Sequence, residues 1–87
     1  MSDSLLSASF GAVVRSRRKI VGLTQEKLAE RAAIHPTYVG LVERGERNPS
    51  LDVAKRIAEA LEMTLAALIA LAEGKRKPAK RGNGGKK

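Results

Sequence analysis

The chain has 87 residues, which is enough for one small domain. It contains no cysteine, so a disulfide framework and a thiolate metal site are excluded, as suits a cytoplasmic protein. The net charge is +8, but residues 74–87 hold seven basic and no acidic residues, whereas residues 1–73 hold ten basic and nine acidic ones. Any nucleic-acid contact by the folded part must therefore come from where its charges lie.

No segment has the pattern of a secretory signal or a membrane span. The N-terminus lacks a basic region followed by a long apolar run, and the longest apolar run, residues 65–72, is far shorter than the roughly 20 residues of a span. Only Phe10 and Tyr38 are aromatic. Because modules that bind single strands or RNA usually stack bases on several rings, duplex DNA is the favoured nucleic acid.

A 3.6-residue apolar period predicts an all-α chain without strands. The predicted helices cover residues 5–21, 25–32, 36–44, 51–61 and 65–73. Thr24, Ser50 and Thr64 are suited to cap the second, fourth and fifth helices, and Gly22 and Gly45 to end the first and third.

The second and third helices are joined by only three residues, Ala33 to His35, which is typical of a helix-turn-helix unit. Val39 and Val42 are predicted to hold the third helix on the core. The outer face of this helix then carries Pro36, Thr37, Tyr38, Gly40, Leu41 and Arg44. A helix held in this way can place its N-terminal end in a major groove of DNA.

Other positions have plainer interpretations. His35 precedes Pro36, so we interpret it as a helix cap and not as a ligand or general base. Thr24 and Gln25, at the start of the second helix, offer N–H groups to a phosphate. The inner face of the fourth helix is predicted to consist of Leu51, Ala54, Ile57, Ala58 and Leu61.

The fifth helix is apolar on all sides, and a monomer covers only one face of its last helix. We therefore predict a homodimer whose interface contains Leu65, Leu68, Ile69, Leu71 and Ala72. Residues 1–9 are predicted to form an N-terminal arm and the start of the first helix, residues 10–73 the domain itself, and residues 74–87 a disordered basic tail that attracts DNA phosphates.

The segment LTQEKLAERAAIHPTYVGLVERGERNPSL, residues 23–51, resembles the XRE family of phage-repressor-like (lambda-repressor-like) helix-turn-helix proteins. The matching positions are Arg18, residues 22–25, 28–29, 37–39, 43–45 and 48–50. The resemblance covers residues 10–73 and implies five helices, binding to a DNA operator as a dimer, and control of transcription.

The resemblance also implies roles for individual residues. Gln25 would hold a phosphate. The base edges would be met by Pro36, Thr37, Tyr38 and Leu41, and the phosphate backbone by Arg44, Arg47 and Asn48. Arg18 and Glu43 would form a buried ion pair. The sequence supports that pair independently, because each residue lies on an apolar helix face, where a charge without a partner costs several kcal/mol.

The chain departs from the family pattern at Ala33, where the turn usually has glycine, and at Glu62, where glycine often ends the fourth helix. The recognition face also has few long hydrogen-bonding side chains. Direct readout of bases is therefore expected to be limited, with DNA shape contributing more.

The sequence contains no nucleophile–base pair, no cluster of metal ligands and no glycine-rich phosphate loop that opens a helix. We therefore expect a protein that is not an enzyme and that uses no cofactor, metal or small-molecule ligand. The expected function is a homodimeric, sequence-specific regulator on an inverted repeat of double-stranded DNA, as a restriction–modification controller or a phage-type repressor, associated with the nucleoid. The alternatives are an antitoxin-like protein-interaction module and a non-specific DNA binder that uses the basic tail.

Overall fold

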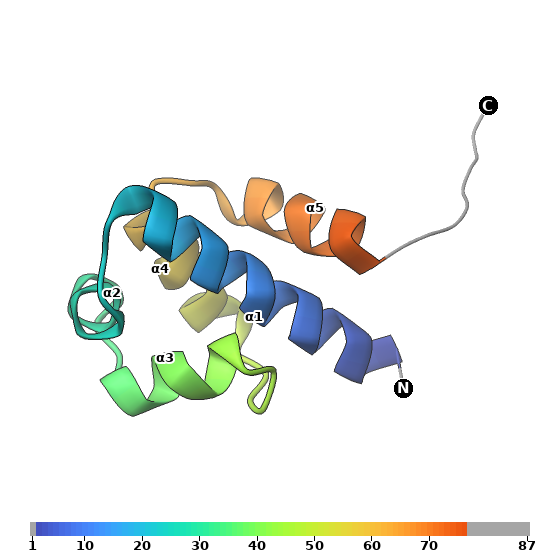
Figure 1. Ribbon diagram of the computed structural model, residues 1–87, viewed down its shortest axis with the longest axis horizontal. Helices are drawn as coiled ribbons and strands as arrows, with labels where there is room; N and C mark the ends of the chain where they lie inside the picture. The colour runs from blue at the N-terminus through green and yellow to red at the C-terminus, as the bar shows by residue number, and fades with distance from the viewer. Residues whose placement is uncertain (1, 77–87) are drawn as a thin grey trace.

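The computed structural model describes residues 2–76, with side chains from residue 6 to residue 74. In this part of the chain there are five helices and no strands, which confirms the predicted all-α fold (Figure 1). The helices are α1 (Ser2–Val21), α2 (Gln25–Ala32), α3 (Pro36–Glu43), α4 (Leu51–Ala60) and α5 (Leu65–Arg76).

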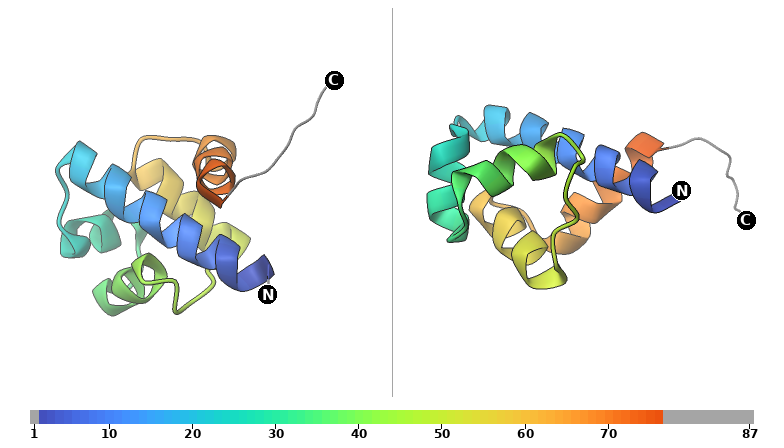
Figure 2. Two further views of the ribbon diagram at one scale, coloured as in Figure 1. Left: turned by 45° about the vertical axis from the view of Figure 1, so that its right-hand side comes forward. Right: turned by 90° about the horizontal axis from the view of Figure 1, so that it is seen from below.

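Helix α1 lies between α3 and α5. It packs against α3 on one side and against α5 on the other, while α2 packs against α3 and α4 (Figures 1 and 2). The largest fully buried side chains come from all five helices and the turn after α4: Val14, Leu28, Val39, Val42, Ile57, Leu61 and Leu68. The helix-turn-helix unit of α2 and α3 is thus supported by one continuous apolar core.

The helix starts follow the capping residues that the sequence predicts. The hydroxyls of Thr24, Ser50 and Thr64 each accept the backbone N–H three residues further on, at 3.0, 3.1 and 3.0 Å. His35 caps α3, because its Nδ1 accepts the backbone N–H of Thr37 at 3.1 Å. The interpretation of His35 as a cap is confirmed.

The ends of the first and last helices differ from the prediction. Helix α1 begins at Ser2, so most of the predicted N-terminal arm (residues 1–9) is helical. Helix α5 continues to Arg76, so residues 74–76 of the predicted tail are helical, and residues 77–87 lie outside the described residues. One glycine, Gly74, weakens a helix but does not end it.

The predicted inner face of α4 is confirmed at four positions and wrong at one. The four buried residues are Ala54, Ile57, Ala58 and Leu61. Leu51, by contrast, is 79% exposed. It is the first residue of α4, so it continues the apolar stripe beyond the edge of the core.

The turn between α2 and α3 uses a backbone conformation that an alanine rarely adopts. Ala33 has φ 59° and ψ 47°, the left-handed region, and its N–H bonds to the end of α2. Glu62 is also left-handed, with φ 66°. A residue with a Cβ atom is strained there by about 1–2 kcal/mol. Both positions are those where the chain departs from the glycine of the family pattern.

Replacing Ala33 by glycine removes this strain. We expect Ala33→Gly to raise the free energy of unfolding by up to about 1 kcal/mol, because relief of the left-handed strain exceeds the added entropy of the unfolded chain. Urea denaturation of the variant and the unmodified chain measures the difference.

The matched control is Ala67→Gly, an exposed position inside α5. That change should lower stability by about 0.5–1 kcal/mol. If both substitutions destabilise the protein equally, the turn does not strain Ala33.

Candidate nucleic-acid interface

A buried ion pair joins α1 to α3. Arg18 Nε donates to Glu43 Oε2 at 2.6 Å and Nη2 donates to Glu43 Oε1 at 3.1 Å. The remaining nitrogen, Nη1, donates to the carbonyl of Leu23 at 2.9 Å. The side chains are only 11% and 3% exposed. The predicted pair is confirmed, and its two-pronged geometry is the arrangement in which an arginine binds a carboxylate most strongly.

The same carboxylate also binds the first residue of α2. Gln25 Nε2 donates to Glu43 Oε1 at 3.0 Å, so one side chain of α3 holds groups from α1 and α2. The amide of Gln25 has a second N–H, which is left for another acceptor. The expected phosphate contact of Gln25 stays a prediction, now with a fixed side-chain position.

The close packing of α1 on α3 depends on Gly11, which the sequence analysis did not single out. A Cβ atom at this position would lie 2.2 Å from the carbonyl oxygen of Val42 and 2.7 Å from that of Glu43. Only glycine allows this approach. The one sequence signal is a glycine inside a strongly apolar helix stretch, beside Phe10.

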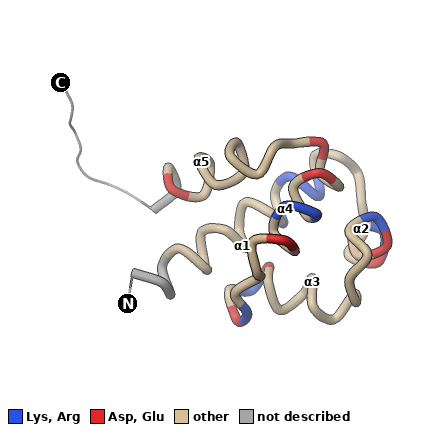
Figure 3. Tube along the Cα trace, turned by 180° about the vertical axis from the view of Figure 1, so that it is seen from behind, with Lys and Arg blue, Asp and Glu red and all other residues tan. Residues whose placement is uncertain are grey.

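The outer face of α3 carries the predicted base-contacting residues. Thr37 is exposed, whereas Pro36, Tyr38 and Leu41 are partly buried. Gly40 was predicted on this outer face but is buried, because the side chain of Arg44 folds over it, with Nη1 3.2 Å from the position of a Cβ atom. Figure 3 shows α3 without charged residues until Glu43 at its end.

The segment after α3 carries the predicted backbone-contacting residues. Arg44, Arg47 and Asn48 are all exposed. Arg44 Nε pairs with Glu46 at 3.3 Å, and the guanidinium of Arg47 lies 5.7 Å from the ring centre of Tyr38. This contact is within the range of a cation–π interaction, so Tyr38 orients Arg47. The contacts of these residues with the phosphate backbone stay predictions.

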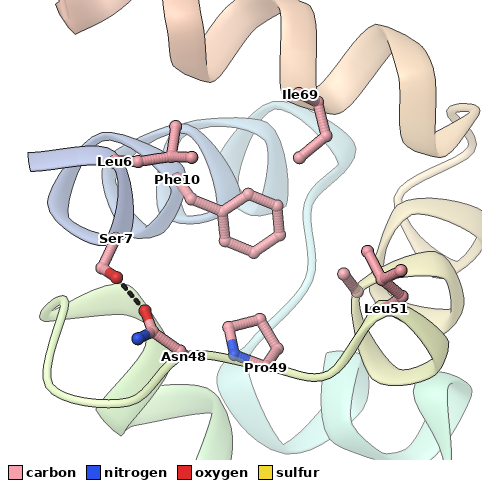
Figure 4. A pocket seen from close by; sticks show the side chains of 8 residues that line it. Leu6, Ser7, Phe10, Asn48, Pro49, Leu51 and Ile69 are labelled. Carbon is pink, nitrogen blue, oxygen red and sulfur yellow. Dashed lines mark hydrogen bonds between the residues drawn. The ribbon is translucent and has the colours of Figure 1, made fainter. Parts of the chain in front are cut away.

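An apolar groove opens beside this segment (Figure 4). It lies between three helices: the N-terminal half of α1, the first turn of α4, and α5. Its main lining residues are Leu6, Phe10, Pro49, Leu51, Ala54 and Ile69. Ser7 donates a hydrogen bond to Asn48 Oδ1 at its rim. The groove therefore borders the segment that is predicted to meet the phosphate backbone.

The structure divides the predicted dimer interface into available and unavailable residues. Leu68 and Ala72 are 0% exposed and belong to the apolar core of the single chain, so these two assignments are wrong for the surface of a folded chain. Leu65 and Ile69 are partly buried. Leu71 is 46% exposed. The 3.6-residue apolar period shows that α5 is apolar. It does not show which side of α5 packs against the other helices of the same chain.

Other kinds of site are not found among residues 2–76. No group of three or more histidine, cysteine, aspartate or glutamate residues is placed to hold a metal ion in this part of the chain. Within the same range, no helix is long and apolar enough to cross a membrane. Lys55 on α4 has a raised pKa, because Glu59 accepts its hydrogen bond at 2.5 Å and adds a favourable charge. Both side chains of this pair are exposed on the surface of α4.

Comparison with known proteins agrees with this geometry. The helix-turn-helix family model HTH_3 matches residues 14–68. The control protein C.SmaI of Serratia marcescens is 46% identical over 56 residues, which are 64% of this chain and 67% of that protein. The control protein C.BamHI of Bacillus amyloliquefaciens is 45% identical over 53 residues, 60% of this chain and 65% of that protein.

Solved structures show the same fold. The restriction–modification controller protein C.AhdI of Aeromonas hydrophila matches with a TM-score of 0.69 and 40% identity, covering 71% of this chain and 94% of that one. The clp gene regulator ClgR of Corynebacterium glutamicum matches with a TM-score of 0.77 and 30% identity, covering 83% and 94%.

The fold and the exposed face of α3 define a helix-turn-helix DNA-binding protein. The chain belongs to the HTH_3 family, that is, the XRE-type helix-turn-helix transcriptional regulators, and is close to restriction–modification controller proteins. The proteins it resembles are DNA-binding regulators and not enzymes.

Loss of the buried pair should destabilise the whole domain. We expect Arg18→Ala to lower the free energy of unfolding by about 3–5 kcal/mol, because it leaves the carboxylate of Glu43 buried without its charged partner. Thermal and urea denaturation followed by circular dichroism measure the loss.

Lys27→Ala provides the control. Lys27 forms an exposed pair with Glu30, so its removal should change stability by less than about 0.5 kcal/mol. An Arg18→Ala protein that melts like the unmodified chain would show that the pair contributes little.

Proposed function

We propose that the chain is a sequence-specific regulator that binds an inverted repeat in duplex DNA as a homodimer, in the role of a restriction–modification controller. The observation that carries the proposal is that α3 exposes Thr37 and is followed directly by three exposed polar residues, Arg44, Arg47 and Asn48. A helix of this kind enters the major groove with its N-terminal residues, while the flanking groups hold the backbone.

The proposed contacts divide into two kinds. Thr37 donates to or accepts from a base edge, and Leu41 and Pro36 make apolar contact, for example with a thymine methyl group. The phosphate backbone is met on one side by the start of α2, with Thr24 and Gln25, and on the other by the segment after α3. These phosphate contacts set the register of α3 but do not themselves read sequence.

The homodimer is proposed to form through the apolar groove and the adjoining side of α5. Leu51 projects into solvent at the rim of the groove, and Ile69 lines it. In a two-fold dimer both copies use the same surface patch. The projecting Leu51 of each copy can therefore enter the groove of the other copy. Two copies related in this way would present two α3 helices to half-sites about 34 Å apart.

The rival functions make different predictions for binding. A sequence-specific regulator should prefer its operator over random duplex DNA by roughly a thousandfold or more. A protein-interaction module, which the limited hydrogen-bonding capacity of α3 favours, should show no such preference. A footprint on DNA upstream of the gene, followed by competition with random duplex, distinguishes the two.

Thr37 provides a sharp test of base readout. We expect Thr37→Val, which keeps the shape and removes the hydroxyl, to lower operator affinity about fivefold, the value of one hydrogen bond of about 1 kcal/mol. Binding to random duplex should be unchanged. Titration of labelled duplexes followed by fluorescence anisotropy measures both affinities.

Thr37→Ser is the matched control, because it keeps the hydroxyl and should retain the operator preference. Equal losses on operator and random DNA would contradict a base contact by Thr37.

The dimer interface is tested by a charge at the rim of the groove. We expect Leu51→Glu to be monomeric at tens of micromolar in sedimentation, because an exposed carboxylate would have to be buried in the contact. Its melting temperature in the monomeric state should be unchanged, since Leu51 is 79% exposed.

Ile20→Glu is the control, because Ile20 is an exposed apolar residue of α1 (67%) that does not line the groove, and this variant should remain a dimer. A monomeric unmodified chain would refute the dimer. Separation by Leu71→Glu but not by Leu51→Glu would place the interface on the side of α5 that carries Leu71.

A further inference from the structure

Positive charge in the folded part of the chain is concentrated in α1. Residues 4–25 contain four basic residues and no acidic one, whereas residues 26–73 contain six basic and eight acidic residues. One of the four, Arg18, is used by the buried pair with Glu43. The excess that remains is on the surface of the second half of α1, and its position decides what it attracts.

Two of these residues lie beside the ends of the helices that form the proposed DNA-binding side. Arg15 and Lys19 are one turn apart on α1, and both are exposed. With Ser16, they line a shallow depression that also contains Glu43, the last residue of α3. Gln25, the first residue of α2, bonds to the same carboxylate. This edge of α1 therefore adjoins the predicted phosphate contact at the start of α2. Figure 2 shows the helices α1 and α3 side by side.

A role within the protein does not explain both residues. The carboxylate of Glu43 already accepts hydrogen bonds from Arg18 and Gln25. Among residues 6–74, Arg15 and Lys19 form no ion pair, whereas Lys27, Arg31 and Lys55 each pair with a glutamate. Cations that are left unpaired at the edge of an interface are available to an anionic partner.

We propose that Arg15 and Lys19 form a second phosphate-contact edge, along which the DNA strand that passes the start of α2 continues. This inference rests on the proposed function. The groups recognised are consecutive phosphodiesters of duplex DNA, and the contacts are electrostatic, so they would strengthen binding to operator and random sequences alike. The edge would supply backbone affinity that the uncharged outer face of α3 lacks.

The test is the salt dependence of DNA binding by the full-length chain with Arg15→Gln, Lys19→Gln and both changes. Each single change should reduce the slope of log K against log salt by about 0.9, and the double change by about twice that amount, on operator and random duplex alike. The control Arg56→Gln removes an exposed basic residue of α4 that, within the described part of the chain, is likewise in no ion pair, and its slope should equal that of the unmodified chain.

The outcomes separate this edge from the proposed function. Circular dichroism must first show unchanged melting, as expected for exposed side chains. An unchanged slope in the double variant, or an equal change in Arg56→Gln, overturns the α1 edge, even if the operator preference is intact. If the unmodified chain has no operator preference, the proposed function fails, while a reduced slope in the double variant still supports phosphate contact by α1.

Discussion

The position of the recognition helix depends on one buried carboxylate. Glu43 lies at the end of α3, and it accepts hydrogen bonds from Arg18 of α1 and Gln25 of α2. Its burial is favourable only because these donors replace the lost water. A shift of α3 against α1 would break several of these bonds together, so α3 has one well-defined orientation. The start of α2 is held by the same group, and the two proposed DNA-contacting elements therefore form a rigid unit.

Local rules account for most of what the sequence predicts correctly. Thr24, Ser50 and Thr64 each precede an apolar helical pattern, and each caps the helix that follows. Such caps can be predicted because a cap involves only residues within one helical turn. The ion pair is a longer-range prediction, but it follows from the same reasoning. Arg18 and Glu43 each lie on an apolar helix face. Because each buried charge needs a partner of opposite sign, and the core is small, the two are expected to pair.

The errors occur where the answer depends on what covers a surface. Leu51, Leu68 and Ala72 are all apolar at positions in phase with a helix period, yet the first is exposed and the other two belong to the core of one chain. A period identifies an apolar face and not its neighbour. Residues 65–72 of α5 are apolar on all sides, so there the period cannot distinguish a covered face from an exposed one. The contact of Gln25 with Glu43 and the close approach at Gly11 were missed for the same reason, since the first depends on how α2 packs on α3 and the second on how α1 packs on α3.

Exposure along α3 has a consequence for how specificity arises. Within the helix itself only Thr37 is both exposed and able to form hydrogen bonds through its side chain. The longer polar side chains lie at the edges of the helix, on Gln25, Arg44 and Arg47. Groups at the edges meet the backbone, whose path depends on groove width and bending, so they sense sequence through DNA shape. Such readout requires that the edges be held rigidly with respect to each other. The carboxylate of Glu43 provides this rigidity, which links the stability of the core to the discrimination proposed for the surface.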